Sequence, residues 1–259
     1  MKNIVVITDC YDVAFNEIRT KIIEILGDRI DEVSIEPVVK VKEFSLINCC
    51  FLTRLMAENY PEGTAFLVLC SPTIEKPNRI YGVTKKKKLL FFGPNNGVLT
   101  WLIKDFGVEE IYISENRSDK EYHPFGGKID YAPTIAKMIL VENLKSLTIG
   151  REAKIDEIKT LEIPDGSIVH IDNFGSCKIK GNLPHIKEGS RVKIDINGKF
   201  IYATFCKRMM SLPDNTYVLY PGSSLTFPEF GLVRGNASKL LDLNIGDVLS
   251  WSIENENKN

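Results

Sequence analysis

The sequence predicts an α/β domain over residues 1–150, followed by a linker and a small all-β domain, barrel or sandwich, over residues 151–259. Three observations support this prediction. In the first 150 residues, short apolar runs alternate with segments of helical periodicity. After residue 150, short β segments alternate with turns of Gly, Pro, Asn and Asp. A chain of 259 residues, 44% of them hydrophobic, is long enough for two cores.

Strands and helices alternate through the first domain. The run "NIVVITD" predicts a buried parallel strand that ends in Asp9. "RIYGVTKKKKLLFFGPN" predicts a hairpin, with the four lysines of 85–88 in a solvated turn at its tip. The other predicted strands are "IDEVSIEPV", "AFLVLCSP" and "EEIYIS". The predicted helices are "VAFNEIRTKIIEIL", "FSLINCCFLTRLMAENY", "GVLTWLIKDFG" and "APTIAKMILVENL".

The second domain is predicted to consist of short strands. A polar connector with one strand of its own, "REAKIDEIKTLEIPDG", leads into it. "NASKLLDLNIGD" predicts one short helix or turn near the end. The predicted β segments are "SIVHIDNFG", "SCKIKGN", "RVKIDING", "KFIYATFC", "TYVLYPG" and "VLSWSIE".

Composition excludes several classes of function. The formal net charge of −1 provides no electrostatic attraction for nucleic acid or an anionic membrane. The sequence shows no signal peptide and no apolar run of membrane-spanning length, so we expect a cytoplasmic protein with reduced thiols. The six cysteines form no CxxC pair, and no metal site is expected. GxSxG, HExxH and Walker motifs are absent.

Polar residues follow three predicted strands of the first domain, where ligands of an open parallel sheet bind. They are Asp9, the "SPT" segment that begins at Ser71, and "GPNNG" at 93–97. A carboxylate at a strand end can accept both hydrogen bonds of a ribose diol, although it can equally cap a helix. "GPNNG" is also typical of a tight turn.

A second polar cluster lies in the β domain. "HIDNFG" is predicted to place Asp172 and Phe174 on one face of a strand. A carboxylate beside an aromatic ring suits an ammonium or sulfonium cation, whereas the alternative is a surface Asp beside a core Phe. The loops "GSSL" (222–225) and "RGNAS" (234–238) could hold a carboxylate or a purine edge.

One of the three histidines begins the stretch "HPFGGKIDYAP" at 123–133. Two hypotheses are open here: that His123 is a catalytic base, and that the glycines present bare backbone N–H groups to an anion. His170 and His185 have no metal-ligand spacing and are predicted to be structural.

Taken in order, the segments TD, PEGT, SP, GPNNG, FGGK, DYAP, HIDNFG and RGNAS resemble the S-adenosylmethionine (SAM) hydroxide adenosyltransferases, relatives of the fluorinases and chlorinases. The resemblance covers about residues 3–250. "GPNNGVLT" and "GSIVHIDNFG" are its most specific pieces. It implies a Rossmann-like N-terminal domain, a C-terminal β barrel, and a homotrimer that binds SAM between subunits. It implies no cofactor besides SAM as the substrate.

The resemblance also implies roles for individual residues. Asp9 would hold the ribose hydroxyls and Phe44 would wall the nucleoside pocket. Asp172 would bind the methionine ammonium, Ser224 its carboxylate, and Asp12 lies near another methionine-contacting position. The remaining positions implied to line the substrate site are Phe125, Phe174, Ser176, Arg234 and Asn236, the last two beside adenine.

Three positions depart from the family's water-handling Asp-Arg-His set. Ser71 stands for the aspartate, Asn78 for the arginine with Arg79 next to it, and Gly126 for the histidine. Ser176 also replaces an asparagine. The backbone N–H of Gly127 would face the nucleophile.

These departures leave three hypotheses. The first is attack of water or hydroxide on SAM, giving adenosine and L-methionine. The second is attack of a halide, as in the chlorinases, giving a 5′-halo-5′-deoxyadenosine. The third is a binding protein without turnover. Since the sulfonium leaves as a neutral thioether, no general acid is needed and positioning supplies most of the rate.

Overall fold

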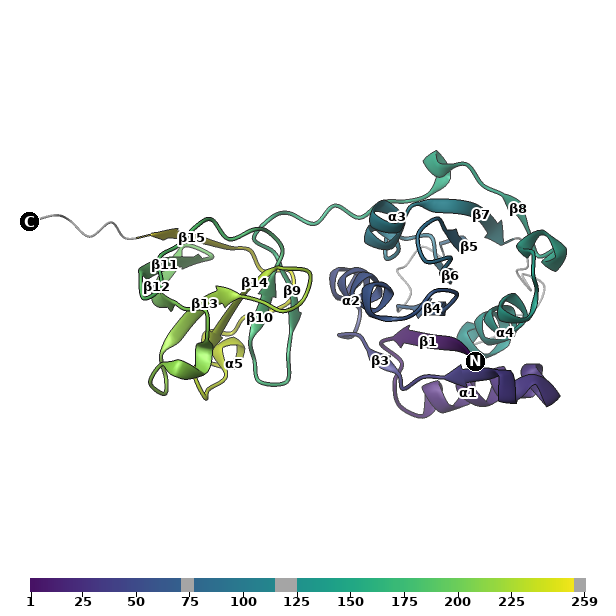
Figure 1. Ribbon diagram of the computed structural model, residues 1–259, viewed down its shortest axis with the longest axis horizontal. Helices are drawn as coiled ribbons and strands as arrows, with labels where there is room; N and C mark the ends of the chain where they lie inside the picture. The colour runs from purple at the N-terminus through teal and green to yellow at the C-terminus, as the bar shows by residue number, and fades with distance from the viewer. Residues whose placement is uncertain (71–76, 115–124, 254–259) are drawn as a thin grey trace, which may run out of the picture. The chain divides into compact units, whose positions relative to one another are not determined.

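The computed structural model describes residues 1–70, 77–114 and 125–253 of the chain (Figure 1). The chain divides into two compact units, Met1–Leu161 and Glu162–Asn259. The first unit contains a mixed sheet with helices, and the second a curled sheet of β strands. The predicted fold class, an α/β domain followed by an all-β domain, is therefore confirmed.

A mixed eight-stranded sheet forms the centre of the first unit, in the order β2-β1-β4-β6-β5-β7-β8, with β3 also paired to β1. Its parallel strands are β1, β2, β3, β4 and β6, whereas β5 is antiparallel to β6 and β7, and β8 to β7. The carboxyl ends of β1, β4, β6 and β7 and the start of β5 consequently lie at one edge. The strands are β1 (Lys2–Thr8), β2 (Val33–Ile35), β3 (Val39–Lys40), β4 (Ala65–Leu69), β5 (Arg79–Thr84), β6 (Leu90–Pro94), β7 (Val108–Ser114) and β8 (Gly150–Glu152).

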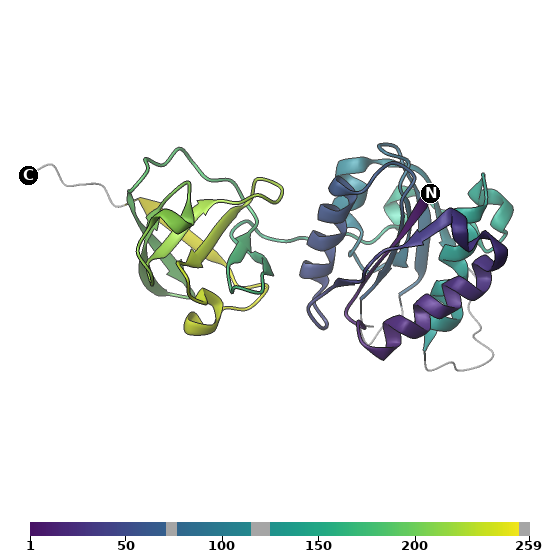
Figure 2. The same ribbon diagram turned by 60° about the horizontal axis from the view of Figure 1, so that its bottom comes forward.

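Helices cover both faces of this sheet (Figure 2). Helices α1 (Val13–Leu26) and α4 (Ala132–Leu140) lie against one face, and α2 (Leu46–Asn59) and α3 (Thr100–Phe106) against the other. In β1, Ile4, Val5, Val6 and Ile7 are all fully buried. A strand covered on both faces requires such a continuous apolar run, which is why the sequence of β1 shows no alternation.

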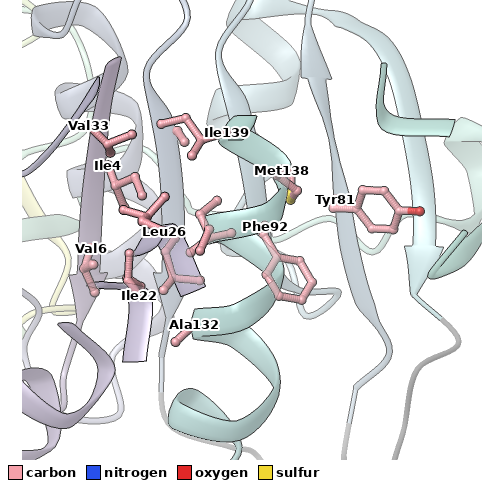
Figure 3. Packing of buried hydrophobic residues seen from close by; sticks show 14 of the residues in the cluster. Ile4, Val6, Ile22, Leu26, Val33, Tyr81, Phe92, Ala132, Met138 and Ile139 are labelled. Atoms are coloured by element: carbon pink, nitrogen blue, oxygen red, sulfur yellow. The ribbon is translucent and has the colours of Figure 1, made fainter. Parts of the chain in front are cut away.

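One core of the first unit lies between the sheet and the helices α1 and α4. Ile22 and Leu26 of α1 pack with Ile4 and Val6 of β1, and Met138 of α4 belongs to the same cluster (Figure 3). These positions of α1 recur at helical spacing. They therefore explain why the segment "VAFNEIRTKIIEIL" folds as a helix against β1.

Side chains determine where the first two helices begin. Asp12 Oδ1 accepts a hydrogen bond from the backbone N–H of Ala14, at 3.0 Å, at the start of α1. Ser45 Oγ accepts one from the N–H of Asn48, at 3.2 Å, at the start of α2. Such caps satisfy N–H groups that have no partner within the helix.

The predicted hairpin is confirmed, because β5 and β6 pair antiparallel across residues 85–88. The expectation that its four lysines are simply solvated is wrong for Lys87. Its ammonium donates to the carbonyl oxygens of Ala57, Glu58 and Tyr60 at 3.0, 2.6 and 2.7 Å. Lys87 thus caps the C-terminus of α2, where a positive charge also stabilises the helix dipole.

A seven-stranded sheet forms the second unit, in the order β15-β11-β12-β13-β14-β10-β9. It curls into a half-barrel around its own core of apolar side chains. Its ends approach each other, because the N–H of Ile168 donates to the carbonyl of Asp247 at 2.8 Å and that of Leu249 to Gly166 at 2.9 Å. The strands are β9 (Ile168–Ile171), β10 (Cys177–Ile179), β11 (Arg191–Ile196), β12 (Lys199–Phe205), β13 (Tyr217–Pro221), β14 (Pro228–Leu232) and β15 (Leu249–Ile253).

One of these strands, β14, is absent from the predicted set. Its sequence "PEFGL" contains a proline and a glycine, both uncommon in strands. All five of its residues are nevertheless buried, between β13 and β10. The predicted short helix near the end of the chain is confirmed as α5 (Ala237–Leu241).

Candidate functional site

Asp9 lies directly after β1, at the carboxyl edge of the first sheet, and holds the loop that precedes α2. Its Oδ2 accepts a hydrogen bond from the backbone N–H of Phe44 at 3.1 Å. Phe44 has a positive φ of 59°, which residues with side chains seldom adopt, and its side chain is 77% exposed. The fold thus brings together two residues that the sequence predicts to bind a nucleoside.

The neighbouring residues Cys10 and Asp12 differ in what they can contribute. Burial raises the pKa of the Cys10 thiol, and the charge of Asp9 raises it further, so this thiol stays protonated and is not an activated nucleophile. Asp12 is exposed and caps α1. Its predicted contact with the methionine moiety stays a prediction.

The "GPNNG" segment contains the last two residues of β6 and the turn after it at the same edge, and Asn95 anchors this turn. The Asn95 carboxamide donates to the carbonyl of Glu157 at 3.0 Å and accepts from the N–H of Lys159 at 2.8 Å. Its own N–H donates to the carbonyl of Asn78 at 2.6 Å. Asn95 is therefore structural. Asn78, whose side chain is exposed, lies beside this turn, and its catalytic role stays a prediction.

Phe125, Gly126 and Gly127 lead into a π-helical turn, η2 (Gly127–Tyr131), that continues into α4. The N–H of Ala132 donates to the carbonyl of Gly127, five residues back. A Cβ on Gly127 would lie 3.0 Å from the ring of Phe125 and 3.3 Å from Ile18. A side chain at Gly127 would therefore crowd Phe125 and Ile18, and the role of its backbone N–H stays a prediction.

Arg79 and Asp130 are not among the predicted site residues. The Nη2 of Arg79 donates to Oδ2 of Asp130 at 2.8 Å, and each side chain is 17% exposed. No motif in the sequence indicates this pair, because 51 residues separate its members and Asp130 lies in the π-helical turn, ahead of the predicted helix.

In the second unit, the prediction that Asp172 and Phe174 share a strand face is wrong. β9 ends at Ile171, and Asp172 begins a tight turn. Its Oδ1 accepts hydrogen bonds from the N–H groups of Phe174 and Ser176, both at 2.9 Å. An Asp at the first position of a turn bonds to the following backbone in this way. The ring of Phe174 is 70% exposed.

Next to this turn, polar side chains line up across four strands. Glu229 on β14 is 5% exposed, pairs with Lys178 on β10, and accepts from the hydroxyl of Tyr220 on β13 at 2.9 Å. Burial raises the pKa of Tyr220, a hydrogen bond with Ser176 opposes this shift, and the charge of Glu229 adds to it. His170 on β9 is paired in register with Lys178. The buried Ser176 thus belongs to a polar network rather than to an apolar core.

The "RGNAS" loop packs directly on the Asp172 turn. A Cβ on Gly175 would collide with the side chain of Asn236, and the N–H of Ser238 donates to the carbonyl of Gly175 at 3.1 Å. Asn236 caps α5, and Arg234 forms an exposed ion pair with Asp214. Asp172, Phe174, Ser176 and Asn236 are therefore neighbours in this unit. Ser224 lies in the turn between β13 and β14, and its ligand contact stays a prediction.

Ser71 and His123 lie outside the described residues. Within residues 1–70, 77–114 and 125–253, no group of His, Cys, Asp and Glu side chains could hold a metal ion. In the same part of the chain, no helix has both the length and the apolar character needed to cross a membrane. All six cysteines are free thiols.

Two family models match this chain and together cover most of it. The N-terminal domain of the SAM hydroxide adenosyltransferases matches residues 4–148, and their C-terminal domain matches residues 166–250. The chain belongs to the SAM hydroxide adenosyltransferase family. The resemblance of its sequence motifs to this family is thereby confirmed.

Individual proteins are similar to this chain in sequence or in fold. The chain is 24% identical over 217 residues to the (R)-S-adenosyl-L-methionine hydrolase of Methanocaldococcus jannaschii, covering 81% of this chain and 79% of that protein. Its fold is similar to that of an uncharacterized conserved protein from Thermotoga maritima, with a TM-score of 0.81, 22% identity and coverage of 96% and 100% of the two chains. A conserved hypothetical protein from Thermus thermophilus has a TM-score of 0.75 at 18% identity, with coverage of 97% and 100%.

The members of this family share a substrate class. SAM hydroxide adenosyltransferases take SAM as their substrate, and both domains of the family are present here. The two groups of predicted residues fall one in each domain: Asp9 and Phe44 in the first unit, and the Asp172 turn with Asn236 in the second.

Proposed function

We propose that this protein cleaves SAM by in-line attack of water or hydroxide at C5′, releasing adenosine and L-methionine. The observation that carries the proposal is the match of both family domains, over residues 4–148 and 166–250. A SAM hydrolase matches 81% of the length of this chain, and this match supports water as the nucleophile.

The proposed binding mode distributes the substrate over the two groups of residues. Asp9 accepts hydrogen bonds from the ribose diol, and the exposed ring of Phe44 covers the nucleoside. Asp172 binds the methionine ammonium and Ser224 the carboxylate, whereas Arg234 and Asn236 lie beside adenine. Phe125, Phe174 and Ser176 complete the lining. Because Asp172 uses Oδ1 for the turn, Oδ2 is the oxygen we assign to the ammonium.

The protein catalyses this reaction mainly by positioning the nucleophile and the substrate. As the new C5′–O bond forms, the C5′–S bond breaks, and its electron pair moves to the sulfonium sulfur. Methionine leaves as a neutral thioether, and the water loses one proton. Holding the nucleophile in line behind C5′ and removing bulk water supply the rate. The backbone N–H of Gly127 and the Asn78 side chain are the groups we assign to the nucleophile, with Ser71 as a third.

Product analysis tests the proposal. Purified protein is incubated with SAM, with and without chloride, bromide or iodide, and the nucleoside is identified by chromatography and mass. Adenosine at the same rate in every salt supports hydrolysis. A 5′-halo nucleoside would replace the proposal with a halogenase, and tight SAM binding without product over hours would replace it with a binding protein.

Light scattering on the same purified protein checks the homotrimer that the resemblance implies, with sites between subunits. We propose this assembly as part of the function on the ground of that resemblance.

A further inference from the structure

The ion pair of Arg79 and Asp130 lies at the edge of the sheet where the substrate is proposed to bind. Arg79 is the first residue of β5, opposite Pro94 at the end of β6 and Ser114 at the end of β7. Because β6 is parallel to β4 and β4 to β1, this is the edge that also carries Asp9. The carboxyl edge of such a sheet is where ligands bind.

The fold holds Asp130 firmly toward Arg79. Asp130 lies in η2, where the π-helical bond from the Ala132 N–H to the Gly127 carbonyl widens the chain by one residue per turn. Pro133, the second residue of α4, has no N–H and cannot donate to the preceding turn. The hydroxyl of Thr134 donates to the Asp130 carbonyl at 2.7 Å. Turns of this kind are frequently found at functional sites.

The guanidinium of Arg79 is fixed as well. It donates to Asp130 Oδ2 at 2.8 Å, and its Cζ lies 4.9 Å from the centre of the Tyr131 ring. With both side chains 17% exposed, the pair is more desolvated than a surface ion pair, so its geometry is better defined. The positive charge of Arg79 is neutralised by Asp130.

Space beside this pair comes from Gly126. A Cβ at Gly126 would lie 3.6 Å from Asp130 Oδ2 and 3.8 Å from Arg79 Nη2, in van der Waals contact with both members of the pair. The second oxygen of Asp130, Oδ1, accepts no hydrogen bond within the described parts of the chain. The pair therefore offers one carboxylate oxygen, next to a residue without a side chain.

We propose that Asp130, oriented by Arg79, accepts a hydrogen bond from the attacking water and takes its proton; this inference rests on the proposed cleavage of SAM. The water oxygen forms the bond to C5′, the C5′–S pair moves to sulfur, and the released proton passes to Asp130 Oδ1 and then to solvent. A carboxylate acting as general base contributes typically 10²–10⁴-fold. An open carboxylate oxygen beside a neutralised guanidinium also repels halides, and it therefore selects water as the nucleophile.

Asp130→Asn tests the assignment, because it keeps the shape and removes the base and its charge. We expect kcat for adenosine formation to fall at least about 100-fold, whereas the Kd for SAM stays unchanged. We also expect the variant to form some 5′-halo nucleoside in chloride or iodide, a product that a merely structural defect would not create. Asp130→Glu should restore part of the activity.

Two further variants serve as a matched control and as an independent test. Asp105→Asn breaks another Arg–Asp pair of the same unit, Arg54–Asp105 at 2.6 Å, and should leave kcat and product unchanged. Gly126→Leu leaves both charges in place but fills the space beside them, and should lower kcat even if Asp130→Asn folds poorly, as judged by circular dichroism.

The outcomes separate the two claims. Adenosine formation by the wild type together with a wild-type kcat in folded Asp130→Asn or Gly126→Leu would overturn the role of Asp130 and leave the proposed function intact. A wild-type protein that forms no adenosine from SAM would overturn both.

Discussion

At the scale of residues, Asp9 combines a structural and a proposed functional interaction. One carboxylate oxygen holds the N–H of Phe44 at 3.1 Å, and Phe44 extends an exposed ring at a φ of 59°. Strained backbone with an exposed apolar side chain is found where a ligand completes the contact. We accordingly predict that a nucleoside stacks on the ring of Phe44.

We predict that Asp9→Ala weakens SAM binding by at least about 100-fold, measured by calorimetry. A hydrogen bond to a charged group contributes about 1.5–3 kcal/mol, and the ribose diol offers two of them. Asp28→Ala, which removes an exposed carboxylate beyond α1, is the control and should bind SAM normally. Equal affinity of the two variants would remove Asp9 from the ribose site.

His170 makes stability depend on pH. Burial lowers its pKa, the charge of Lys178 lowers it further, and Asp172 and Glu229 oppose the shift. The unfolded chain therefore binds a proton at a higher pH than the native protein does. The free energy of unfolding is fully retained above the unfolded pKa of about 6.5 and decreases as the pH falls below it.

We accordingly expect a lower Tm at about pH 5.5 than at about pH 7.5, and a smaller difference in His170→Gln. His185→Gln changes an exposed histidine outside the helices and strands and should keep the wild-type difference. If both variants keep that difference, His170 is not its source.

At the scale of elements, the turn between β9 and β10 and the cap of α5 form one assembly. Gly175 has a φ of 82°, and a Cβ there would collide with the Asn236 carboxamide that caps α5. The Asn236 cap can therefore occupy its place only because residue 175 of the turn has no side chain. A change at Gly175 should disturb both the Asp172 carboxylate and the loop assigned to adenine.

Gly175→Ala and Gly189→Ala separate the clash from the strain. Both glycines have a φ of 82°, but nothing lies within 4 Å of a Cβ at Gly189. We expect each variant to lose about 1–2 kcal/mol for the left-handed conformation, and Gly175→Ala to lose about 1–3 kcal/mol more from the collision. Urea unfolding measures the difference, and equal losses would contradict the packing described here.

Elements differed in how well their sequences predicted them. The apolar run of β1 and the helical spacing in α1 were sufficient, because burial on both faces leaves a continuous apolar run and burial of one stripe leaves a helical period. β14 carries a proline and a glycine, and η2 precedes Pro133, so local preferences opposed both elements. β14 is held by its pairing with the neighbouring strands β10 and β13. η2 is held by hydrogen bonds from Thr134 and Arg79 to Asp130. The sequence pattern reveals neither set of contacts.

At the scale of the whole molecule, the proposed site draws on both units, which subunit mixing can test. We predict that Asp9→Ala and Asp172→Ala are each inactive, and that mixing them under conditions of subunit exchange restores part of the activity. In a closed ring, a subunit with an intact first unit can then face one with an intact second unit. Mixing either variant with itself is the control, and no recovery in the mixture would contradict a site shared between subunits.

By itself, the sequence determined the fold class, the family, and most of the residues proposed to bind SAM, because apolar periodicity and short polar motifs are local signals. Tertiary structure decided which of those residues are neighbours: it joined Asp9 to Phe44 and Gly175 to Asn236, and it placed Asp172 in a turn instead of on a strand. It also brought Arg79 to Asp130 across 51 residues. An ion pair formed by a strand start and a π-helical turn depends on the packing of the whole sheet edge, and a linear pattern does not contain that information.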